Sequence, residues 1–174
     1  GGQGWINTGS SWTLLSDSAD PRTKVPVTTL VMPDDLLYLS TWRAGAASAT
    51  LADGRILLLG TDASAEIYDP VSRTFTPTGS MTSARYGSTA TVVGTKVYVI
   101  GGQRYDEAQH MTIGVTSVEV FDPAANGGAG AFSPAGSLHV GRTHHTATVI
   151  PATTNILVTG GWTWSGNSQT IVQS

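Results

Sequence analysis

The stretch from Arg85 to Pro123 reads RYGSTATVVGTKVYVIGGQRYDEAQHMTIGVTSVEVFDP. Small and β-branched residues alternate over residues 88–93, and residues 96–100 are rich in β-branched side chains, so both segments are predicted strands. Gly94-Thr95 lies between them and suits a tight hairpin turn, in which glycine takes the position that needs a positive φ. The first half of the stretch therefore predicts an antiparallel hairpin.

The second half of the stretch adds a third strand. Gly101-Gly102 ends the second strand, because glycine tolerates backbone angles that other residues avoid. A polar loop follows, and Val118 to Phe121 is a further predicted strand. Asp122-Pro123 then opens a turn, since proline presets φ.

The same pattern occurs in three copies. Each copy begins with an arginine, at positions 43, 85 and 142, which are 42 and 57 residues apart. A self-similar unit of about 40 to 50 residues with up to four strands is typical of the blades of a β-propeller. The predicted fold class is accordingly all-β, with about three to four four-stranded blades from a larger ring.

At these residues the sequence resembles the kelch repeat. The resemblance covers roughly residues 43–174 and rests on two glycine doublets, on the Glu-x-Tyr/Phe-Asp-Pro runs, and on Phe75 and Phe132 in the expected outer strands. The run Ala-Thr-Leu-x-Asp-Gly-Arg-Ile, from residue 49, is most similar to bacterial and fungal repeats such as those of the galactose oxidase propeller. Two departures stand out: Leu59-Gly60 replaces a doublet, and residues 151–154 predict a longer first hairpin.

The expected blades divide the chain into four segments. These are a partial blade or N-terminal segment (residues 1–42), two full blades (43–84 and 85–141) and an incomplete blade (142–174). The strands expected besides those above are 45–51, 55–59, 65–68, 74–76, 131–133, 146–150, 155–159 and 169–172, with Asp53-Gly54 as a tight turn.

Two registers are open for residues 1–42. In one, Gly1-Gly2 ends a second strand and the segment supplies the outer half of a preceding blade, with a short strand at Ser11 to Leu15. In the other, residues 27–40 form a first hairpin, from strands at 27–32 and 36–40. Because propellers have four to eight blades, we expect either further blades in a longer chain or an oligomeric partner.

Composition excludes several classes of protein. A net charge of −3 without a basic cluster argues against a nucleic-acid partner, and no apolar run is long enough to span a membrane. Cysteine is absent, which mildly favours a bacterial or cytosolic source. The two lysines among many Thr, Ser, Gly and Trp favour a bacterial extracellular or cell-surface protein.

Candidate binding residues lie in two kinds of loop. One kind joins one blade to the next, and the other joins the second strand of a blade to its third strand. Those loops are residues 79–85, 102–116, 136–142 and 161–168, and aromatic and polar side chains in them suit sugar rings or peptide side chains. The candidate ligand contacts are Arg43, Arg85, Arg142, Tyr86, Arg104, Tyr105, Trp162 and Trp164.

The three arginines that open the repeats have two possible roles. In galactose oxidase and in the kelch adaptors of ubiquitin ligases, arginines at this position contact substrate or acidic peptides, so the resemblance implies an anion-binding ring. Alternatively, each arginine hydrogen-bonds carbonyl groups within the blades. Glu66 and Glu119 precede apolar residues in equivalent strands and are expected to be hydrogen-bond partners inside the blades.

His145 is the weak candidate for a metal ligand. The run Arg142 to Thr146 is similar to the Arg-x-Tyr-His-Ser run of copper radical oxidases, which matches His145 but places His144 where the tyrosine stands. The chain has no cysteine for the thioether of those enzymes, and adjacent strand residues point to opposite faces. We therefore expect no catalytic residues and no cofactor in this chain.

The leading hypothesis is a non-catalytic binding or scaffolding module that engages a protein or glycan through its loop face. One alternative is the propeller part of a copper radical oxidase or another carbohydrate-active enzyme. The other is a structural surface protein.

Overall fold

The structure is a computed structural model, and it describes residues 4–7, 11–15, 30–31, 45–165 and 168–172. The chain forms two compact units, residues 1–38 and 39–174. Arg43 and the strand expected at residues 36–40 lie outside the described residues. No helix of the described residues is long and apolar enough to cross a membrane.

The N-terminal unit contains a three-stranded antiparallel sheet in the order β1-β2-β3. Its strands are β1 (Gly4–Asn7), β2 (Ser11–Leu15) and β3 (Leu30–Val31). The strand predicted at Ser11 to Leu15 is thus confirmed, and β3 lies within the strand predicted at residues 27–32. Gly1-Gly2, on which the first register depends, is not among the described residues.

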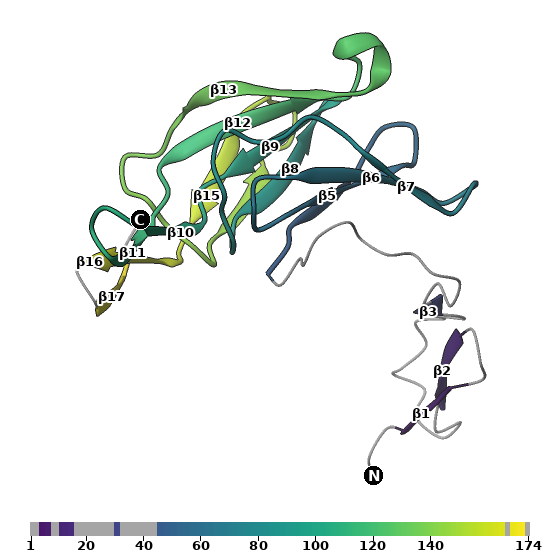
Figure 1. Cartoon of the computed structure of the whole chain (residues 1–174), viewed down its shortest axis with the longest axis horizontal. Coiled ribbons are helices and arrows are strands. Elements are labelled where there is room, and N and C mark those ends of the chain that lie inside the picture. Colours follow the sequence, from purple (N-terminus) through teal and green to yellow (C-terminus); the bar gives the residue numbers. More distant parts are fainter. Residues whose placement is uncertain (1–3, 8–10, 16–29, 32–44, 166–167, 173–174) are drawn as a thin grey trace. The chain divides into compact units, whose positions relative to one another are not determined.

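Two four-stranded sheets form the centre of the second unit (Figure 1). The first blade contains β4 (Ser48–Thr50), β5 (Ile56–Leu59), β6 (Ala65–Asp69) and β7 (Thr74–Pro77), paired in chain order. The second blade contains β8 (Thr89–Val93), β9 (Lys96–Ile100), β12 (Ser117–Asp122) and β13 (Ala131–Ser137), also paired in chain order. A 3₁₀ turn, η1 (Asn126–Gly128), connects β12 to β13.

The third blade is a two-stranded sheet of β14 (Thr146–Val149) and β15 (Ile156–Thr159). Two further hairpins extend from the ends of β9 and β15: β10 (Gln103–Asp106) with β11 (Met111–Gly114), and β16 (Trp162–Ser165) with β17 (Ser168–Ile171). The first hairpin corrects the loop expected at residues 102–116. The second contains β17 at the strand predicted at residues 169–172, but β17 pairs with β16 and not with β15, so it is not the third strand of the blade. The limits 43–84, 85–141 and 142–174 remain predictions.

The turns follow the glycines and the loop lengths. Val93 pairs with Lys96 around Gly94-Thr95, and Gly94 has φ +61°, as the hairpin turn requires. The turn at Asp53-Gly54 is one residue longer than expected. The N–H of Leu51 donates to the carbonyl of Arg55, so residues 52–54 form the turn. The hairpin at residues 151–154 is the longest of the three, as its sequence predicts.

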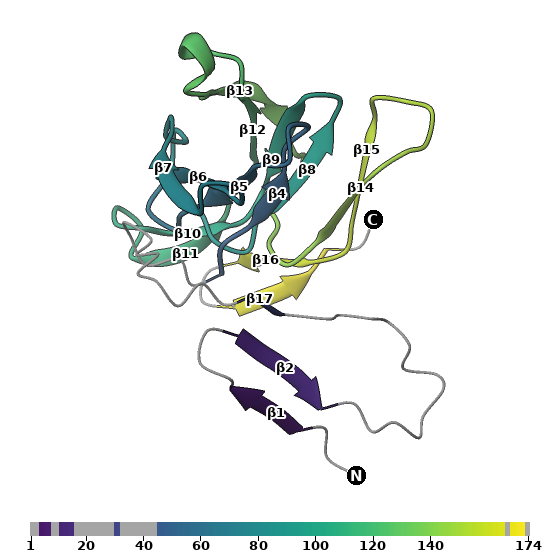
Figure 2. The ribbon, with the colours of Figure 1, turned by 90° about the vertical axis from the view of Figure 1, so that its right-hand side faces the viewer.

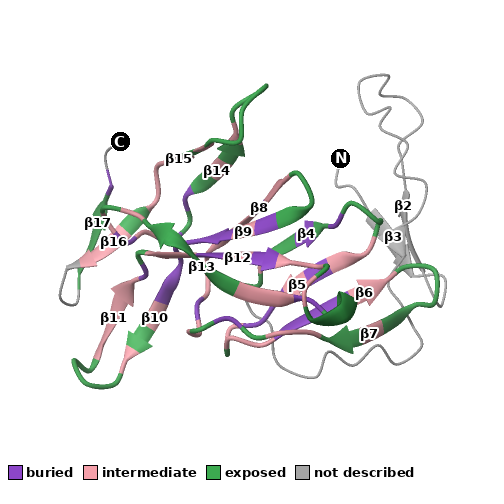
Figure 3. Ribbon diagram, turned by 90° about the horizontal axis from the view of Figure 1, so that it is seen from above, coloured by how far each residue is buried: buried purple, intermediate pink, exposed green. Residues whose placement is uncertain are grey.

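The core lies between the first and second blades. Leu57, Val97, Val99 and Phe121 are completely buried in one apolar cluster. The innermost strands β4, β8 and β14 contact one another in succession, so the blades are arranged around a shared side (Figure 2). Figure 3 shows the buried residues along β9, whereas β14 and β15 are mainly exposed or partly exposed.

The outer strands are joined to the blades by aromatic pairs. Phe75 of β7 lies 4.9 Å from Tyr68 of β6, and Phe132 of β13 lies 4.9 Å from Phe121 of β12, measured between ring centroids. Phe75 and Phe132 therefore lie in the outer strands, where the repeat pattern predicts them.

Candidate functional site

A cavity of about 580 Å³ opens at the end of the blades where the β5–β6, β7–β8 and β9–β12 connections meet; we call this end the loop face. The lining residues of the cavity come from the β5–β6 connection, the β7–β8 connection and β10: Thr61, Ser83, Ala84, Tyr86, Arg104 and Tyr105. Three of the predicted ligand contacts, Tyr86, Arg104 and Tyr105, are thus brought together.

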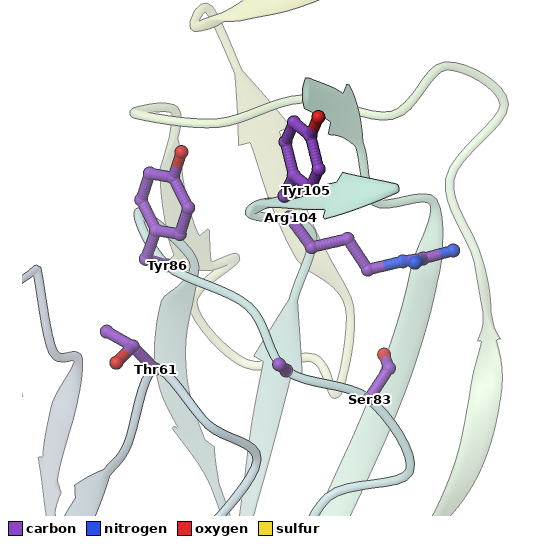
Figure 4. Close-up of a pocket in the computed structure, with 6 residues that line it drawn as sticks. Thr61, Ser83, Tyr86, Arg104 and Tyr105 are labelled. Carbon is purple, nitrogen blue, oxygen red and sulfur yellow. The ribbon is translucent and has the colours of Figure 1, made fainter. Parts of the chain in front are cut away.

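The β10–β11 hairpin positions Arg104 and Tyr105. Tyr86 forms an isolated β-bridge with Gln103, with N···O distances of 3.0 and 2.8 Å. Gln103 is buried, and its Oε1 accepts a hydrogen bond of 2.7 Å from Trp164 Nε1. Arg104 and Tyr105 follow Gln103 in β10, and both line the cavity. In Figure 4 the two tyrosine rings point the same way, and Arg104 extends away from them above Ser83.

Arg104 is the charged residue among those that line the cavity. Its Nη2 lies 3.5 Å from Asp106 Oδ2, a long contact, and its side chain is 39% exposed. The Asp106 carboxylate also accepts hydrogen bonds from the N–H groups of Ala108 and Gln109, at 3.0 and 3.1 Å. Asp106 is therefore held by its own turn, and the Arg104 guanidinium keeps donors for another acceptor.

Arg85 is buried inside the second blade. Its side chain is 0% exposed and forms an ion pair with Glu119. The guanidinium also donates to the carbonyl and hydroxyl oxygens of Ser117, both at 2.9 Å, and to Ser83 Oγ at 3.2 Å. Burial lowers the pKa of Arg85, and the charge of Glu119 opposes that change. This geometry supports the prediction that Arg85 hydrogen-bonds groups within the blade. The buried guanidinium is not accessible to a ligand.

Arg142 occupies the equivalent place in the third blade. Its Nη1 donates to the carbonyl of Gly160 at 3.2 Å, as Nη1 of Arg85 does to Gly101 at 3.4 Å. Arg142 is only partly buried and has no carboxylate partner among the described residues. Neither Arg85 nor Arg142 lines the cavity, and Arg43 is outside the described residues.

Trp162 and Trp164 lie in β16 and do not line the cavity. The Trp162 ring stacks on His144, with a centroid distance of 5.1 Å and an interplanar angle of 29°. Trp164 bonds to Gln103, as described above, so it links the two hairpins. Both tryptophans support neighbouring elements, and Trp164 holds the hairpin that carries Arg104.

His145, the weak metal candidate, is buried in the wall between the second and third blades. Its Nε2 lies 3.1 Å from Thr89 Oγ1, and burial, with the nearby charges of Arg142 and His144, lowers its pKa to about 4. The described residues contain no group of three or more His, Cys, Asp or Glu that could hold a metal ion.

The stability of the protein is expected to fall as the pH is lowered from 6.5 to about 4.5. In this interval His145 is protonated in the unfolded chain but stays neutral in the folded one, so the unfolded state binds more protons. We expect a loss of about 1–2 kcal/mol after allowance for solvent screening, measured by urea unfolding across the pH range. His145→Gln should flatten this dependence, and His110→Gln, at an exposed histidine, should preserve it. A flat profile for the wild-type protein would contradict the prediction.

Sequence reasoning did not identify Thr61 as part of the site. Thr61 lies in the β5–β6 connection, which corresponds to the β9–β12 connection of the next blade. That equivalence is the signal by which it could have been found, since both connections emerge at the loop face. The expected loop at residues 79–85 does contain Ser83 and Ala84.

Comparisons with known proteins agree with this architecture. The family model for the Kelch motif matches residues 84–126. The solved structure of YjhT is similar with a TM-score of 0.60 and 17% sequence identity, over 73% of this chain and 37% of the YjhT chain. No curated protein sequence matches the chain. The match to the motif and the likeness in fold, together with the sheets described above, show that this chain carries kelch-type repeats and that its sheets are blades of a β-propeller.

Proposed function

We propose that this chain is a non-catalytic binding module whose loop-face cavity takes an acidic side chain of a protein ligand. Kelch repeats generally indicate binding or scaffolding modules, and kelch propellers generally bind proteins. The observation that carries the proposal is the cavity itself, in which Arg104 supplies the charge and Tyr86 and Tyr105 supply aromatic surface. A rigid blade on each side holds these groups in place.

The chemistry of the lining favours a carboxylate beside an apolar group. A guanidinium binds a carboxylate through two parallel N–H donors, and such charge-assisted bonds are stronger than neutral ones. The tyrosine rings offer flat apolar surface with a hydroxyl at the end, which suits the flanking side chains of a peptide. Thr61 and Ser83 add hydroxyl groups at the cavity wall.

Peptides with Asp or Glu beside an aliphatic or aromatic residue are expected to bind the intact chain, and Arg104→Gln should weaken that binding at least tenfold. Tenfold corresponds to about 1.4 kcal/mol, within the range for a hydrogen bond to a charged group. Binding would be measured first on paired peptide and glycan arrays and then by titration calorimetry. Because Arg104 is partly exposed, the affinity should also fall as NaCl is raised.

The matched control is Arg73→Gln, which removes an exposed arginine from the β6–β7 turn at the opposite end of the first blade. It should leave peptide affinity unchanged. Acidic peptides that bind no better than their Asn and Gln counterparts would contradict the proposed ligand class. Glycans that bind the wild-type chain and the Arg104→Gln chain with equal affinity would also contradict the proposed ligand class.

A further inference from the structure

Asp106 places a fixed negative charge beside the loop-face cavity. Its Oδ2 lies 3.5 Å from Nη2 of Arg104, the charged residue of the cavity wall. Its Oδ1 accepts hydrogen bonds from the N–H groups of Ala108 and Gln109, at 3.0 and 3.1 Å. The carboxylate therefore cannot turn away from Arg104 without losing the two bonds that hold the β10–β11 turn.

The charge of Asp106 reaches any anion that Arg104 binds. The Asp106 side chain is 15% exposed, against 39% for Arg104, so water screens the acidic group less than the basic one. An anion oxygen that accepts a hydrogen bond from Arg104 Nη2 lies within about 6.5 Å of Asp106 Oδ2. This distance is shorter than the Debye length of about 8 Å at physiological salt. Asp106 is not among the residues that line the cavity, so it acts on the ligand through space.

The charge balance of the cavity favours an anion with a single charge. Arg104 and Asp106 together carry no net charge, and the neighbouring Arg85 is completely buried and paired with Glu119. The attraction of an anion to the guanidinium rises in proportion to its charge, whereas the cost of removing the anion from water rises with the square of that charge. A phosphorylated side chain carries about −1.5 to −2 charges at pH 7 and is typically bound by a cluster of arginines. One guanidinium with a carboxylate beside it suits a carboxylate ligand better.

We propose that Asp106 is a specificity-determining residue that restricts the loop-face cavity to singly charged carboxylates and excludes phosphorylated side chains. The inference rests on the proposed function, because it specifies the charge of the ligand that the same cavity takes. Asp106 opposes a doubly charged group by repulsion, and a built-in repulsive group is a common source of specificity.

The test compares three capped peptides by titration calorimetry of the intact chain at pH 7 and constant ionic strength. They are Gly-Leu-Glu-Phe-Gly and its counterparts with glutamine or phosphoserine in place of the glutamate. The wild-type chain should bind the glutamate peptide about tenfold more tightly than the phosphoserine peptide. Because this comparison leaves the protein unchanged, it holds even if a variant of Asp106 fails to fold.

Asp106→Asn should reduce the preference for glutamate over phosphoserine by about threefold to tenfold, since the phosphate gains more from the loss of repulsion. Asparagine keeps a side-chain oxygen for the N–H groups of Ala108 and Gln109, so the turn should persist. The matched control is Asp122→Asn. Asp122 also accepts an N–H of its own turn, from Ala124 at 3.0 Å, and pairs with a cation, Lys96, at 3.0 Å. It lies at the end of β12 away from the loop face, so the preference should stay unchanged.

Three outcomes would overturn this inference and leave the proposed function intact. The first is a phosphoserine peptide that binds the wild-type chain as tightly as the glutamate peptide. The second is an unchanged preference in Asp106→Asn. The third is weaker binding of the glutamate peptide to Asp106→Asn, which would show that Asp106 orients Arg104 and does not repel the ligand. A glutamate peptide that binds the wild-type chain no better than the glutamine peptide would overturn the proposed function and this inference together.

Discussion

Replacement of Glu119 with alanine is expected to lower the free energy of unfolding by about 3–5 kcal/mol, the cost of leaving one partner of a buried ion pair uncompensated. Arg85 and Glu119 have side chains that are 0% and 2% exposed. The Glu119 carboxylate also accepts hydrogen bonds from the N–H and hydroxyl of Thr82, at 2.8 and 3.0 Å. The variant therefore loses the carboxylate that pairs with Arg85. It also loses the acceptor that holds Thr82 where the chain enters the second blade. Urea unfolding monitored by circular dichroism measures the loss.

A matched control and a double variant make this prediction specific. Lys96 and Asp122 form an exposed pair at 3.0 Å, and Lys96→Ala should cost less than about 1 kcal/mol. The double variant Arg85→Met with Glu119→Leu should be more stable than Glu119→Ala, because no buried charge remains. A loss for Glu119→Ala as small as that for Lys96→Ala would mean that the pair does not hold the blade.

Gly101→Ala is expected to destabilise the protein by about 1–3 kcal/mol more than Gly94→Ala. The two glycines have nearly the same backbone angle, φ +60° and +61°, so a side chain causes a similar strain of about 1–2 kcal/mol at either position. They differ in space: a Cβ at Gly101 would lie 2.6 Å from the carbonyl oxygen of Arg142, and one at Gly94 would meet nothing within 4 Å. Displacing packed backbone supplies the additional cost.

Gly101 lies against Arg142 at the boundary between the second and third blades. The carbonyl of Arg142 accepts a hydrogen bond of 2.8 Å from the N–H of Gly102, which joins the second blade to the third. Urea unfolding of both variants provides the comparison. Equal losses for Gly94→Ala and Gly101→Ala would show that only the left-handed backbone matters and that the blades do not touch closely at this point.

Part of the site could be predicted because the repeat pattern is local. Tyr86, Arg104 and Tyr105 follow landmarks that sequence alone identifies, namely the arginine that opens the second blade and the doublet Gly101-Gly102. The β10–β11 hairpin was missed because its residues are mostly polar and lack the alternation of a half-buried strand. Its packing depends on Trp164, 61 residues away from Gln103, and no local pattern carries that contact.

The residue pattern by itself determined the all-β fold, the kelch-type repeats, the central strands of the two full blades and the turn at Gly94, because alternation, glycine and proline act through neighbours in the chain. Only the tertiary structure determined which groups surround each arginine. Arg85 is sealed inside the second blade because the pairing of β9 with β12 brings it Glu119, 34 residues away. Arg104 instead faces a cavity because the β10–β11 hairpin projects beyond the sheet. Arg85 and Arg104 have the same side chain, and only the surrounding strands decide that Arg85 pairs inside the blade and that Arg104 lines the cavity.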